Sequence, residues 1–355
     1  MSEPLSVADY ERLAEARLEP GVWAYLAGGS GDEWTLRENR AAYERWTFRP
    51  RVLCDVSDVS TATTALGERL ELPVLVAPVA YQQLYDPEAE AATARAAATA
   101  GTVMCVSTFT SRTHEEIAAA APGVRQWCQL YVFNDRGVTR EHLAGAADAG
   151  CSAVVLTVDT PRLASRERDL RAGFQIPTEL PLPYARTAVG SAPSNPAEQF
   201  ALLDASVSWR DLEWIASEGR LPVVLKGVVT AEDAKLALEH GAAAIVVSNH
   251  GGRQLDGVPA TLDALPEVVE AVGGGAEVYL DGGIRRGADV ATALALGARA
   301  VLAGRAPMYG LAVAGEDGVR QVLQLLREEL ALALCLLGCG SPEQLTRAHV
   351  QPSRS

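Results

Sequence analysis

The sequence predicts an α/β fold in which eight parallel strands, each followed by a helix, close into a (β/α)8 TIM barrel. Short, almost continuously apolar runs recur along the chain, as in parallel strands buried on both faces. Ala-, Leu- and Glu-rich stretches separate these runs. An open doubly wound sheet is the alternative, but its dinucleotide-binding fingerprint is missing. The glycines of residues 28–34 (GGSGDEW) follow no strand-like run and have the wrong spacing.

The individual elements can be placed in order along the chain. The expected strands are 73–77, 102–107, 125–131, 153–159, 222–226, 243–248, 277–281 and 300–303. The clearest expected helices are 88–101, 141–150, 231–241 and 288–298. Thr113 with Glu116, and Thr230 with Asp233, have the spacing of helix-opening caps. The glycines expected to end helices are Gly150, Gly241 and Gly297.

We expect residues 1–355 to form a single domain. Residues 1–72 are interpreted as an N-terminal helical segment packed on the barrel, which spans 73–340. The connection 160–221, after the fourth strand, is unusually long and rich in Pro, Ser and Ala. Such a segment in a compact domain is usually a lid or disordered. It follows a strand at the face where barrel active sites form, so we expect a lid loop with a helix.

Composition narrows the class of function. The chain has 355 residues, 48% hydrophobic and 21% charged, with a formal net charge of −14. This acidic balance argues against nucleic acid or an anionic membrane as the main partner. No apolar run approaches the ~20 residues that span a bilayer, and the N-terminus does not resemble a secretory signal, so a cytoplasmic protein is expected.

The six cysteines are scattered and lie mostly in apolar stretches, at positions 54, 105, 128, 151, 335 and 339. Buried reduced thiols are a better interpretation than a disulfide framework. Cys335 and Cys339 could face one way on a helix, but two sulfurs without a second pair make a weak case for zinc.

Polar residues stand where most of the expected strands end. In a barrel, the carboxyl ends of all strands meet at one mouth, where active sites form. Any one of these residues alone is more simply a solvated loop residue or a satisfied buried polar group. Their recurrence over most strands favours a shared site. They are Gln129, Tyr131, Thr157, Asp159, Lys226, Ser248, His250, Arg253, Asp281, Gly304 and Arg305.

The last two expected strands lead into glycine-rich turns with arginines, DGGIRRG (281–287) and Gly304-Arg305. Barrel loops at this place commonly bind phosphate through backbone N–H groups and a helix N-terminus. Arg285 and Arg305 could clamp its oxygens. From these residues alone, the phosphate could belong to a substrate or to a cofactor such as flavin mononucleotide (FMN). The alternative without a ligand is two tight turns with surface arginines.

His250 is the candidate general base, because a histidine of near-neutral pKa suits proton transfer. Asp159, at a nearby strand end, could fix its tautomer. Arg253 and Arg166 offer forked donors to a carboxylate, and Tyr131 offers a phenol. Only one histidine is expected at the mouth, without an acidic cluster, so no metal site is expected. The remaining histidines, at 114, 142, 240 and 349, lie in helical or terminal segments and are expected at the surface.

The segment SNHGGRQLD (248–256) resembles the active-site signature of the FMN-dependent 2-hydroxy-acid oxidases and dehydrogenases, which include glycolate oxidase, lactate oxidase and mandelate dehydrogenase. The resemblance covers nearly the whole chain, with its motifs in the family's order. These motifs lie at 29–53, 72–84, 129–139, 156–163, 221–228, 281–298 and 304–319.

The resemblance implies a role for each matching position. His250 is the base, Asp159 its partner, and Tyr131 a hydrogen-bond donor to the substrate oxygen. The carboxylate is bound by Arg253 and Tyr25, supported by Arg166. The residues implied around the flavin ring and ribityl chain are Pro78, Val79, Ala80, Ser107, Gln129, Thr157, Lys226 and Ser248. Asp281 is implied to hold the ribityl chain, and the implied phosphate ligands are Gly283, Arg285, Gly304 and Arg305.

The sequence departs from the common pattern at three positions near the implied substrate pocket. Val79 stands where many members have threonine, Phe109 where glycolate oxidase has tryptophan, and Tyr81 where methionine is common. The combination is closer to hydroxymandelate-oxidase-like members, so Phe109 and Tyr81 are interpreted as lining a pocket for an aromatic side chain. A small glycolate- or lactate-type substrate is the alternative.

The resemblance implies oxidation of an (S)-2-hydroxy acid to the 2-oxo acid with O2 reduced to hydrogen peroxide, in a homotetramer. A quinone or cytochrome acceptor is an alternative. The 160–221 segment lacks the apolar, basic insertion of membrane-bound mandelate dehydrogenases, which favours O2 and no membrane partner. From another class, a flavin-free lyase or isomerase of a phosphorylated substrate would also use a phosphate-binding barrel. A non-catalytic binding protein is a third alternative.

Overall fold

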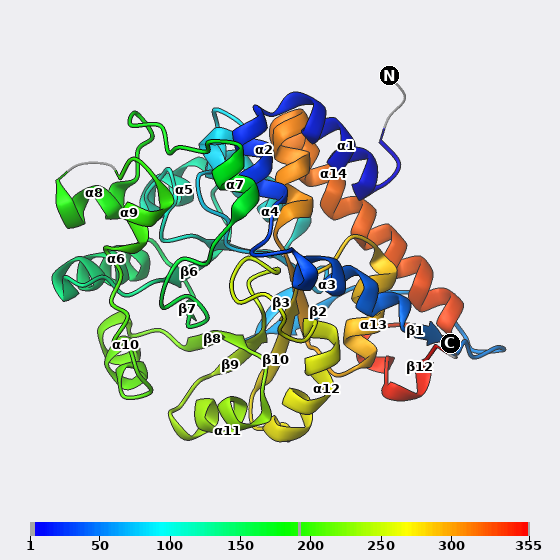
Figure 1. Ribbon diagram of the computed structural model, residues 1–355. Coiled ribbons are helices and arrows are strands. Elements are labelled where there is room, and N and C mark those ends of the chain that lie inside the picture. Colours follow the sequence, from blue (N-terminus) through cyan, green and yellow to red (C-terminus); the bar gives the residue numbers. More distant parts are fainter. Residues whose placement is uncertain (1–3, 191–192, 354–355) are drawn as a thin grey trace.

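The computed structural model describes residues 4–190 and 193–353 and has a closed barrel of parallel strands at its centre (Figure 1). The strands pair in the order β10-β11-β4-β5-β6-β7-β8-β9, and β9 pairs with β10 to close the barrel. Each of the eight expected strands is present, so the predicted (β/α)8 barrel is confirmed and the open sheet is excluded. Their bounds are β4 (Val74–Val76), β5 (Val103–Val106), β6 (Arg125–Leu130), β7 (Ala153–Thr157), β8 (Val223–Val228), β9 (Ala244–Val247), β10 (Glu277–Asp281) and β11 (Ala300–Ala303).

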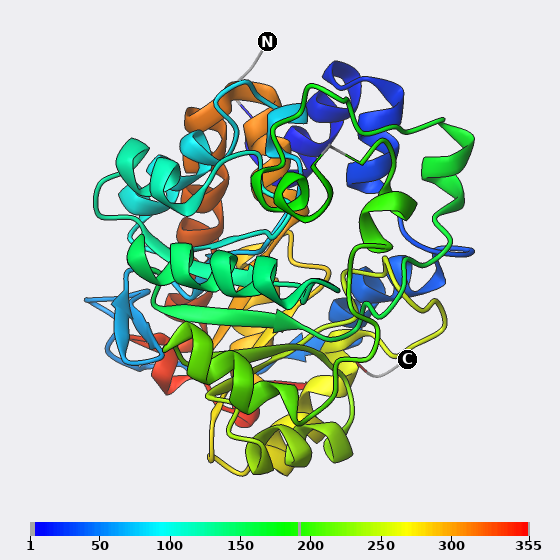
Figure 2. The ribbon, with the colours of Figure 1, turned by 90° about the vertical axis from the view of Figure 1, so that its left-hand side faces the viewer.

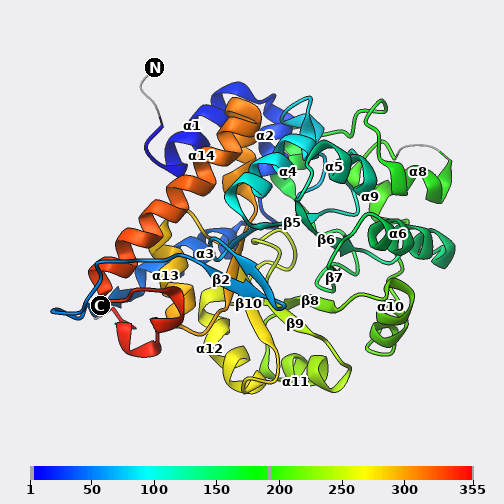
Figure 3. The same ribbon diagram turned by 180° about the vertical axis from the view of Figure 1, so that it is seen from behind.

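The interior of the barrel is a packed apolar core. Leu75, Trp127 and Tyr279 belong to one buried cluster there, and the rings of Trp127 and Tyr279 lie 5.6 Å apart. A hairpin of β2 (Thr63–Ala65) and β3 (Glu68–Leu70) packs on the barrel (Figure 3). Its residues Ala65 and Leu70 belong to the same buried cluster. The hairpin therefore covers the amino-terminal end of the barrel, and the carboxyl end is left for a site.

Helices surround the barrel in the alternating order that the sequence predicts. Thr113 and Glu116 form a complete capping box, and the side chain of Thr230 accepts a hydrogen bond from the backbone of Asp233. The helices are α4 (Ala89–Ala100), α5 (His114–Ala120), α6 (Arg136–Asp148), α10 (Asp211–Gly219), α11 (Ala231–Glu239), α12 (Thr261–Val272), α13 (Gly287–Ala295) and α14 (Arg305–Leu337). The expected terminators Gly150, Gly241 and Gly297 all have positive φ angles.

The N-terminal segment packs against the end of the chain. It contains α1 (Val7–Arg17), α2 (Pro20–Ala27) and α3 (Trp34–Glu44), and α1 lies along α14 (Figure 1). Strand β1 (Trp46–Phe48) pairs antiparallel with β12 (Val350–Pro352). Helix α14 is interrupted at Ala314 and Gly315, whose backbone angles are not helical. These contacts fix α2 and α3 beside the mouth of the barrel.

The long connection after β7 is built largely of short helices rather than irregular chain (Figure 2). Its described part contains α7 (Glu167–Arg171), α8 (Pro183–Val189), α9 (Pro196–Phe200) and α10. Leu203 forms an isolated antiparallel bridge with Phe133, and α7 contacts α2. The connection is thereby held over the carboxyl end of the barrel.

The structure confirms the expectation for the cysteines and contradicts the expectation for two of the histidines. All six cysteines lie in the described part of the chain and carry free thiols, as predicted, although Cys54 is exposed. The expectation that His114 and His142 lie at the surface is wrong, because both are fully buried. His114 begins α5 and His142 lies within α6. Their place in a helix did not by itself reveal that their side chains face the barrel. No helix in the described ranges is long and apolar enough to cross a bilayer.

Candidate active site

The residues predicted from strand ends and motifs converge on one cavity at the carboxyl end of the barrel. Asp159 and Ser248 do not line it but bond directly to residues that do. The predicted residues that line the cavity are Tyr25, Pro78, Val79, Ala80, Tyr81, Ser107, Phe109, Gln129, Tyr131, Thr157, Arg166, Lys226, His250, Arg253, Asp281, Gly283, Arg285, Gly304 and Arg305.

His250 presents one ring nitrogen to the cavity. Its Nδ1 lies 2.8 Å from Oδ1 of Asp159, and its Nε2 lies 3.5 Å from the hydroxyl of Tyr131. A carboxylate can only accept, so Nδ1 carries the proton in the neutral ring and Nε2 keeps its lone pair. The Thr160 hydroxyl donates to the same carboxylate oxygen at 2.7 Å. Sequence reasoning missed Thr160, although it directly follows Asp159.

The surroundings of His250 and Asp159 keep the imidazole neutral and the carboxyl group ionised. Burial lowers the pKa of His250 below its ordinary value, with Asp159 acting in the opposite direction. Burial alone would raise the pKa of Asp159, but the neighbouring His250 and Lys226 lower it to about 2. At neutral pH, the pair is therefore a neutral imidazole and a carboxylate, and Nε2 of His250 can accept a proton.

The segment that carries His250 has an uncommon backbone. His250 itself has φ 58°, in the left-handed region, where a non-glycine residue is strained. Gly252 follows at φ 75°, and a Cβ there would lie 2.6 Å from the backbone nitrogen of Leu36 in α3. The glycine thus allows α3 to pack directly on the loop. Tight packing of this kind holds the histidine in its strained position.

Arg253 lies beside Tyr25, as the resemblance implies. The guanidinium sits over the Tyr25 ring, 4.6 Å from its centroid, and donates to the carbonyl of Gly28 at 3.0 Å. Arg166 is nearly fully buried, and its Nε donates to the carbonyl of Arg253 at 3.2 Å. Burial and the charge of Arg253 lower the pKa of Arg166 to about 10. Two cations held this close favour an anionic ligand in the cavity.

Lys226, Ser248 and Asp281 form a buried polar chain below the histidine. Nζ of Lys226 lies 2.9 Å from the Ser248 hydroxyl and 3.1 Å from Oδ2 of Asp281. Burial would lower the pKa of Lys226, but Asp281 and Asp159 outweigh it and raise that pKa, so the amine is charged. Oδ1 of Asp281 is buried without a partner among the described residues. Such an oxygen needs a donor, and a ligand hydroxyl could provide one.

The ends of β5, β6 and β7 add polar groups on the opposite side of the mouth. Gln129 accepts a hydrogen bond from the backbone of Thr108 at 2.9 Å and donates to the Thr157 hydroxyl at 3.2 Å. The hydroxyl of Ser107 accepts from the backbone of Phe109 at 3.2 Å. These bonds fix the orientation of the amide and hydroxyl groups toward the cavity.

Arg285 and Arg305 form the predicted cationic end of the cavity. Arg305 donates to the carbonyls of Leu26, Gly251 and Gly28, at 3.0, 3.0 and 2.8 Å. Burial and the neighbouring Arg253 lower its pKa to about 10, with Arg285 acting in the same direction. The cavity end therefore carries clustered positive charge, which favours a phosphate.

The remaining wall is aromatic. The ring of Phe109 lies 5.5 Å from that of Tyr131 and 5.8 Å from that of Phe200. Tyr25 stacks on Phe174 at 4.6 Å and lies 5.3 Å from Tyr81. Phe200 was missed by sequence reasoning because it comes from α9 in the long connection. The sequence of the 160–221 connection has no hydrophobic periodicity that would have placed Phe200 at the cavity.

Comparison with known proteins identifies the class. A model of the family described as FMN-dependent dehydrogenase matches residues 14–352. Glycolate oxidase 3 of Oryza sativa subsp. indica is 48% identical over 354 residues, covering 97% of this chain and 95% of that protein. L-lactate oxidase of Nostoc sp. is 49% identical over 356 residues, covering 97% of each. A solved mandelate oxidase with (S)-4-hydroxymandelic acid is similar with a TM-score of 0.94 and 46% identity, covering 99% of this chain and all of that one.

The chain belongs to the FMN-dependent dehydrogenase family. It is an FMN-dependent oxidoreductase built on a (β/α)8 barrel, which excludes the flavin-free lyase or isomerase and the non-catalytic binding protein. The cavity fits the cofactor. Asp281 has a buried oxygen without a described partner, and Arg285 and Arg305 gather positive charge where the sequence predicts phosphate.

Proposed function

We propose that the protein oxidises an (S)-2-hydroxy acid that carries an aromatic side chain, with release of hydrogen peroxide. The similar proteins are named as oxidases of glycolate, L-lactate and mandelate. All three acids are 2-hydroxy acids, and two-electron oxidation of the hydroxyl-bearing carbon gives a 2-oxo acid. The observation that carries the aromatic specificity is the wall of Phe109, Tyr131 and Phe200, whose rings lie within 5.8 Å of one another beside His250. Aromatic rings in such an arrangement favour offset or edge contacts with an aryl group.

His250 acts as the base in this proposal. Its Nε2 accepts the proton of the substrate hydroxyl, while Asp159 stabilises the imidazolium that forms. The Tyr131 hydroxyl, 3.5 Å from Nε2, lies where it can donate to the substrate oxygen. Burial raises the pKa of Tyr131, so its hydroxyl remains a donor throughout the working pH range.

Arg253 and Tyr25 bind the substrate carboxylate, and Arg166 supports them. The planar guanidinium of Arg253 matches a carboxylate in a bidentate arrangement, and its position over Tyr25 fixes the plane of the fork. Arg166, bonded to the carbonyl of Arg253, holds that loop and adds positive charge. The carboxylate, the hydroxyl and the aromatic side chain are thereby oriented by three different walls.

When bound, FMN would supply the two-electron redox chemistry, with O2 as the proposed final acceptor. We propose that Lys226 would stabilise negative charge on the flavin ring and that Asp281 would accept hydrogen bonds from the ribityl chain. The residues proposed around the ring are Pro78, Val79, Ala80, Ser107, Gln129, Thr157, Lys226 and Ser248. Those proposed for the phosphate are Gly283, Arg285, Gly304 and Arg305. At Gly283, a Cβ would lie 2.0 Å from the Asn39 carbonyl, so glycine is required for the turn to pack on α3.

The acceptor, the assembly and the location are part of the proposal. O2 is favoured over a quinone or cytochrome because the glycolate oxidase, L-lactate oxidase and mandelate oxidase to which the chain is similar are all named as oxidases. A homotetramer follows the resemblance to the family. A cytoplasmic location is supported by the free thiols of all six cysteines, which suit a reducing compartment.

The test is anaerobic reduction of the flavin by glycolate, lactate, mandelate and 4-hydroxymandelate, followed by readmission of O2. We expect a higher second-order rate constant of flavin reduction, and a higher aerobic kcat/KM, for the two aryl acids than for glycolate, with stoichiometric hydrogen peroxide after O2 is restored. A clear preference for glycolate would overturn the aromatic assignment. Reoxidation by a quinone but not by O2 would overturn the oxidase assignment.

A further inference from the structure

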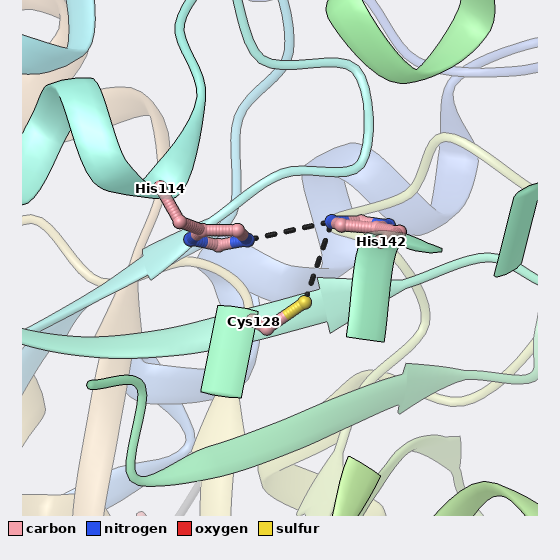
Figure 4. A group of neighbouring side chains, drawn as sticks. All are labelled: His114, Cys128 and His142. Carbon is pink, nitrogen blue, oxygen red and sulfur yellow. Dashed lines mark hydrogen bonds between the residues drawn. The ribbon is translucent and has the colours of Figure 1, made fainter. Parts of the chain in front are cut away.

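Three potential metal ligands meet outside the barrel wall, away from the active-site cavity. His114 is the first residue of α5, Cys128 lies on β6, and His142 lies on α6 (Figure 4). All three are buried, with at most 1% of their surface exposed. Nε2 of His142 lies 3.4 Å from Nε2 of His114 and 3.4 Å from Sγ of Cys128. All three atoms lie within 4.8 Å of one another.

The hydrogen bonds of Gln126 determine the tautomer of His114. Its Nε2 donates to the carbonyl of His114 at 3.3 Å, so its Oε1 is the atom that lies 3.2 Å from Nδ1 of His114. An amide oxygen only accepts, and Nδ1 must therefore carry the proton. Burial lowers the pKa of His114 to about 4, so the ring is neutral and its Nε2 carries a lone pair. That lone pair faces His142.

His142 cannot satisfy all its neighbours through hydrogen bonds. If its proton is on Nδ1, its Nε2 lone pair faces that of His114, and Nδ1 is a buried donor without a partner among the described residues. If its proton is on Nε2, the single N–H can point at His114 or at Cys128 but not well at both, and Nδ1 is a buried acceptor without a partner among the described residues. Tyr184, stacked 3.8 Å from the His142 ring, fixes the plane of that ring. A cation between the three atoms would use the Nε2 lone pairs of both histidines and the sulfur of Cys128 at once, which hydrogen bonding achieves in neither tautomer of His142.

We propose that His114, His142 and Cys128 form a binding site for one thiophilic d10 metal ion, of the Cu(I) and Zn(II) class. The ion would be bound by Nε2 of each histidine and by the thiolate of Cys128, whose proton leaves on binding. The site would join α5, β6 and α6, and would act on stability rather than on the reaction. Metal–nitrogen bonds of about 2.0–2.1 Å and metal–sulfur bonds of about 2.3 Å place ligand atoms about 3.3–3.6 Å apart at tetrahedral angles and about 3.5–3.8 Å apart in a planar three-coordinate site. The two separations of 3.4 Å match the tetrahedral values and lie within a few tenths of an ångström of the three-coordinate ones.

Charge and ligand number favour Cu(I) within this class. One thiolate neutralises Cu(I), whereas Zn(II) would leave a net positive charge in a buried region, which is costly. Structural zinc sites also use four protein ligands, and only three side chains converge here in the described chain. Soft thiolate ligands and a three-coordinate arrangement suit Cu(I).

Cys151 provides a matched control. It is a buried thiol in the same region, with Sγ 3.4 Å from Nδ1 of His114, on the opposite side of that ring from Nε2. Cys151→Ser therefore removes a neighbouring sulfur but none of the proposed ligands. Cys54 is exposed and lies near Gly338, so Cys54→Ser is introduced into every variant to remove adventitious binding at the surface.

The experiment uses the FMN-loaded protein after removal of metals under reducing conditions. Cu(I), under anaerobic conditions, and Zn(II) are each titrated against a chromophoric chelator, and bound metal is measured after gel filtration. We expect about one ion per chain in the Cys54→Ser background and in Cys151→Ser, with Cu(I) bound more tightly. Cys128→Ser and His142→Gln are expected to lose this binding. Metal should raise the Tm of the Cys54→Ser background and of Cys151→Ser, but not of Cys128→Ser or His142→Gln, because it stabilises only a folded protein that binds it.

Flavin content and turnover serve as folding controls, because none of the substituted residues lines the active-site cavity. Normal flavin content with lost metal binding in Cys128→Ser supports the site. Two results would overturn it: no stoichiometric binding of either ion by the parent, or equal binding by Cys128→Ser and the parent. If Cys128→Ser does not fold, Co(II) added to the parent provides the second measurement. A thiolate-to-cobalt charge-transfer band that persists in Cys151→Ser supports the site, and its absence from the parent contradicts it.

Discussion

Oδ1 of Asp159 lies 2.8 Å from Nδ1 of His250, and this contact sets both the tautomer and the proton affinity of the histidine. The carboxylate raises the pKa of a ring whose burial lowers it. The position of Asp159 depends in turn on Gly227 in β8. A Cβ on Gly227 would lie 2.8 Å from the Cβ of Asp159. The proposed base therefore depends on a close approach between two strand ends.

The first prediction concerns pH. The rate of flavin reduction should rise with pH as His250 loses its proton and level off above a pKa below the ordinary value near 6.5. Asp159→Asn removes the group that raises this pKa, so the acid limb should move to lower pH. The plateau should fall by up to the ~10²–10⁴-fold that a general base contributes. Anaerobic stopped-flow reduction between acid and neutral pH measures both. An acid limb that moves to higher pH in Asp159→Asn would contradict the assigned contact.

The second prediction concerns His250 itself. His250→Asn keeps a polar side chain but cannot accept a proton at neutral pH. Flavin content should be retained, whereas flavin reduction should slow by at least ~10²–10⁴-fold. Single-turnover bleaching of flavin-loaded protein is the measurement. Reduction at the parent's rate would remove His250 from the proposed mechanism, and loss of flavin alone would indicate a structural role.

A third prediction follows from Gly227, which has φ 117°. Gly227→Ala adds a Cβ that must displace Asp159, and the backbone angle is strained for alanine. We expect kcat for flavin reduction to fall while substrate KM changes little, because Arg253 and Tyr25 are untouched. The acid limb should move in the same direction as in Asp159→Asn. Gly257→Ala is a control for strain alone, since that glycine also has a positive φ but no atom lies within 4 Å of its added Cβ. Equal effects in both variants would exclude the displacement of Asp159.

Much of this site could be predicted from the sequence because a parallel barrel brings its strand ends together. Each strand is buried on both faces, which produces the continuous apolar runs, and the first polar residues after them lie at one mouth. Lys226, Asp281 and Arg305 were located in this way, and the structure places all three at one cavity. The roles of these residues in flavin binding and catalysis stay predictions.

Residues outside that pattern could not be located. Phe200 reaches the cavity from α9, and the sequence of the long connection has no periodicity that fixes its path. His114 and His142 are buried because α5 and α6 pack against β6 and Tyr184, a contact between segments far apart in sequence. Only tertiary structure brings these two histidines to Cys128. The expectation of no metal site rested on the residues at the barrel mouth and did not extend to this cluster.

The fourth prediction tests the phosphate end. Arg305→Ala removes a partly buried cation and should weaken FMN binding by about 1.5–3 kcal/mol, the contribution of a charge-assisted hydrogen bond. Arg286→Ala is the matched control, since Arg286 pairs with Glu329, is half exposed and does not line the cavity. Equilibrium titration of the apoprotein with FMN measures both. Equal affinity in the parent and Arg305→Ala would refute the phosphate assignment.

The last prediction tests the aromatic wall. The ring of Phe200 lies 5.8 Å from those of Phe109 and Tyr131, so Phe200→Ala removes one side of the proposed aryl site without touching His250 or Arg253. An aromatic pair contributes about 0.5–1.5 kcal/mol beyond burial, so kcat/KM for mandelate should fall at least about 2- to 13-fold relative to lactate. Lactate is the internal control, because its methyl group does not reach across the pocket as an aryl ring would. Both values come from one steady-state assay of peroxide release. If both acids lose kcat/KM by the same factor, Phe200 supports the fold of the connection and does not select the side chain.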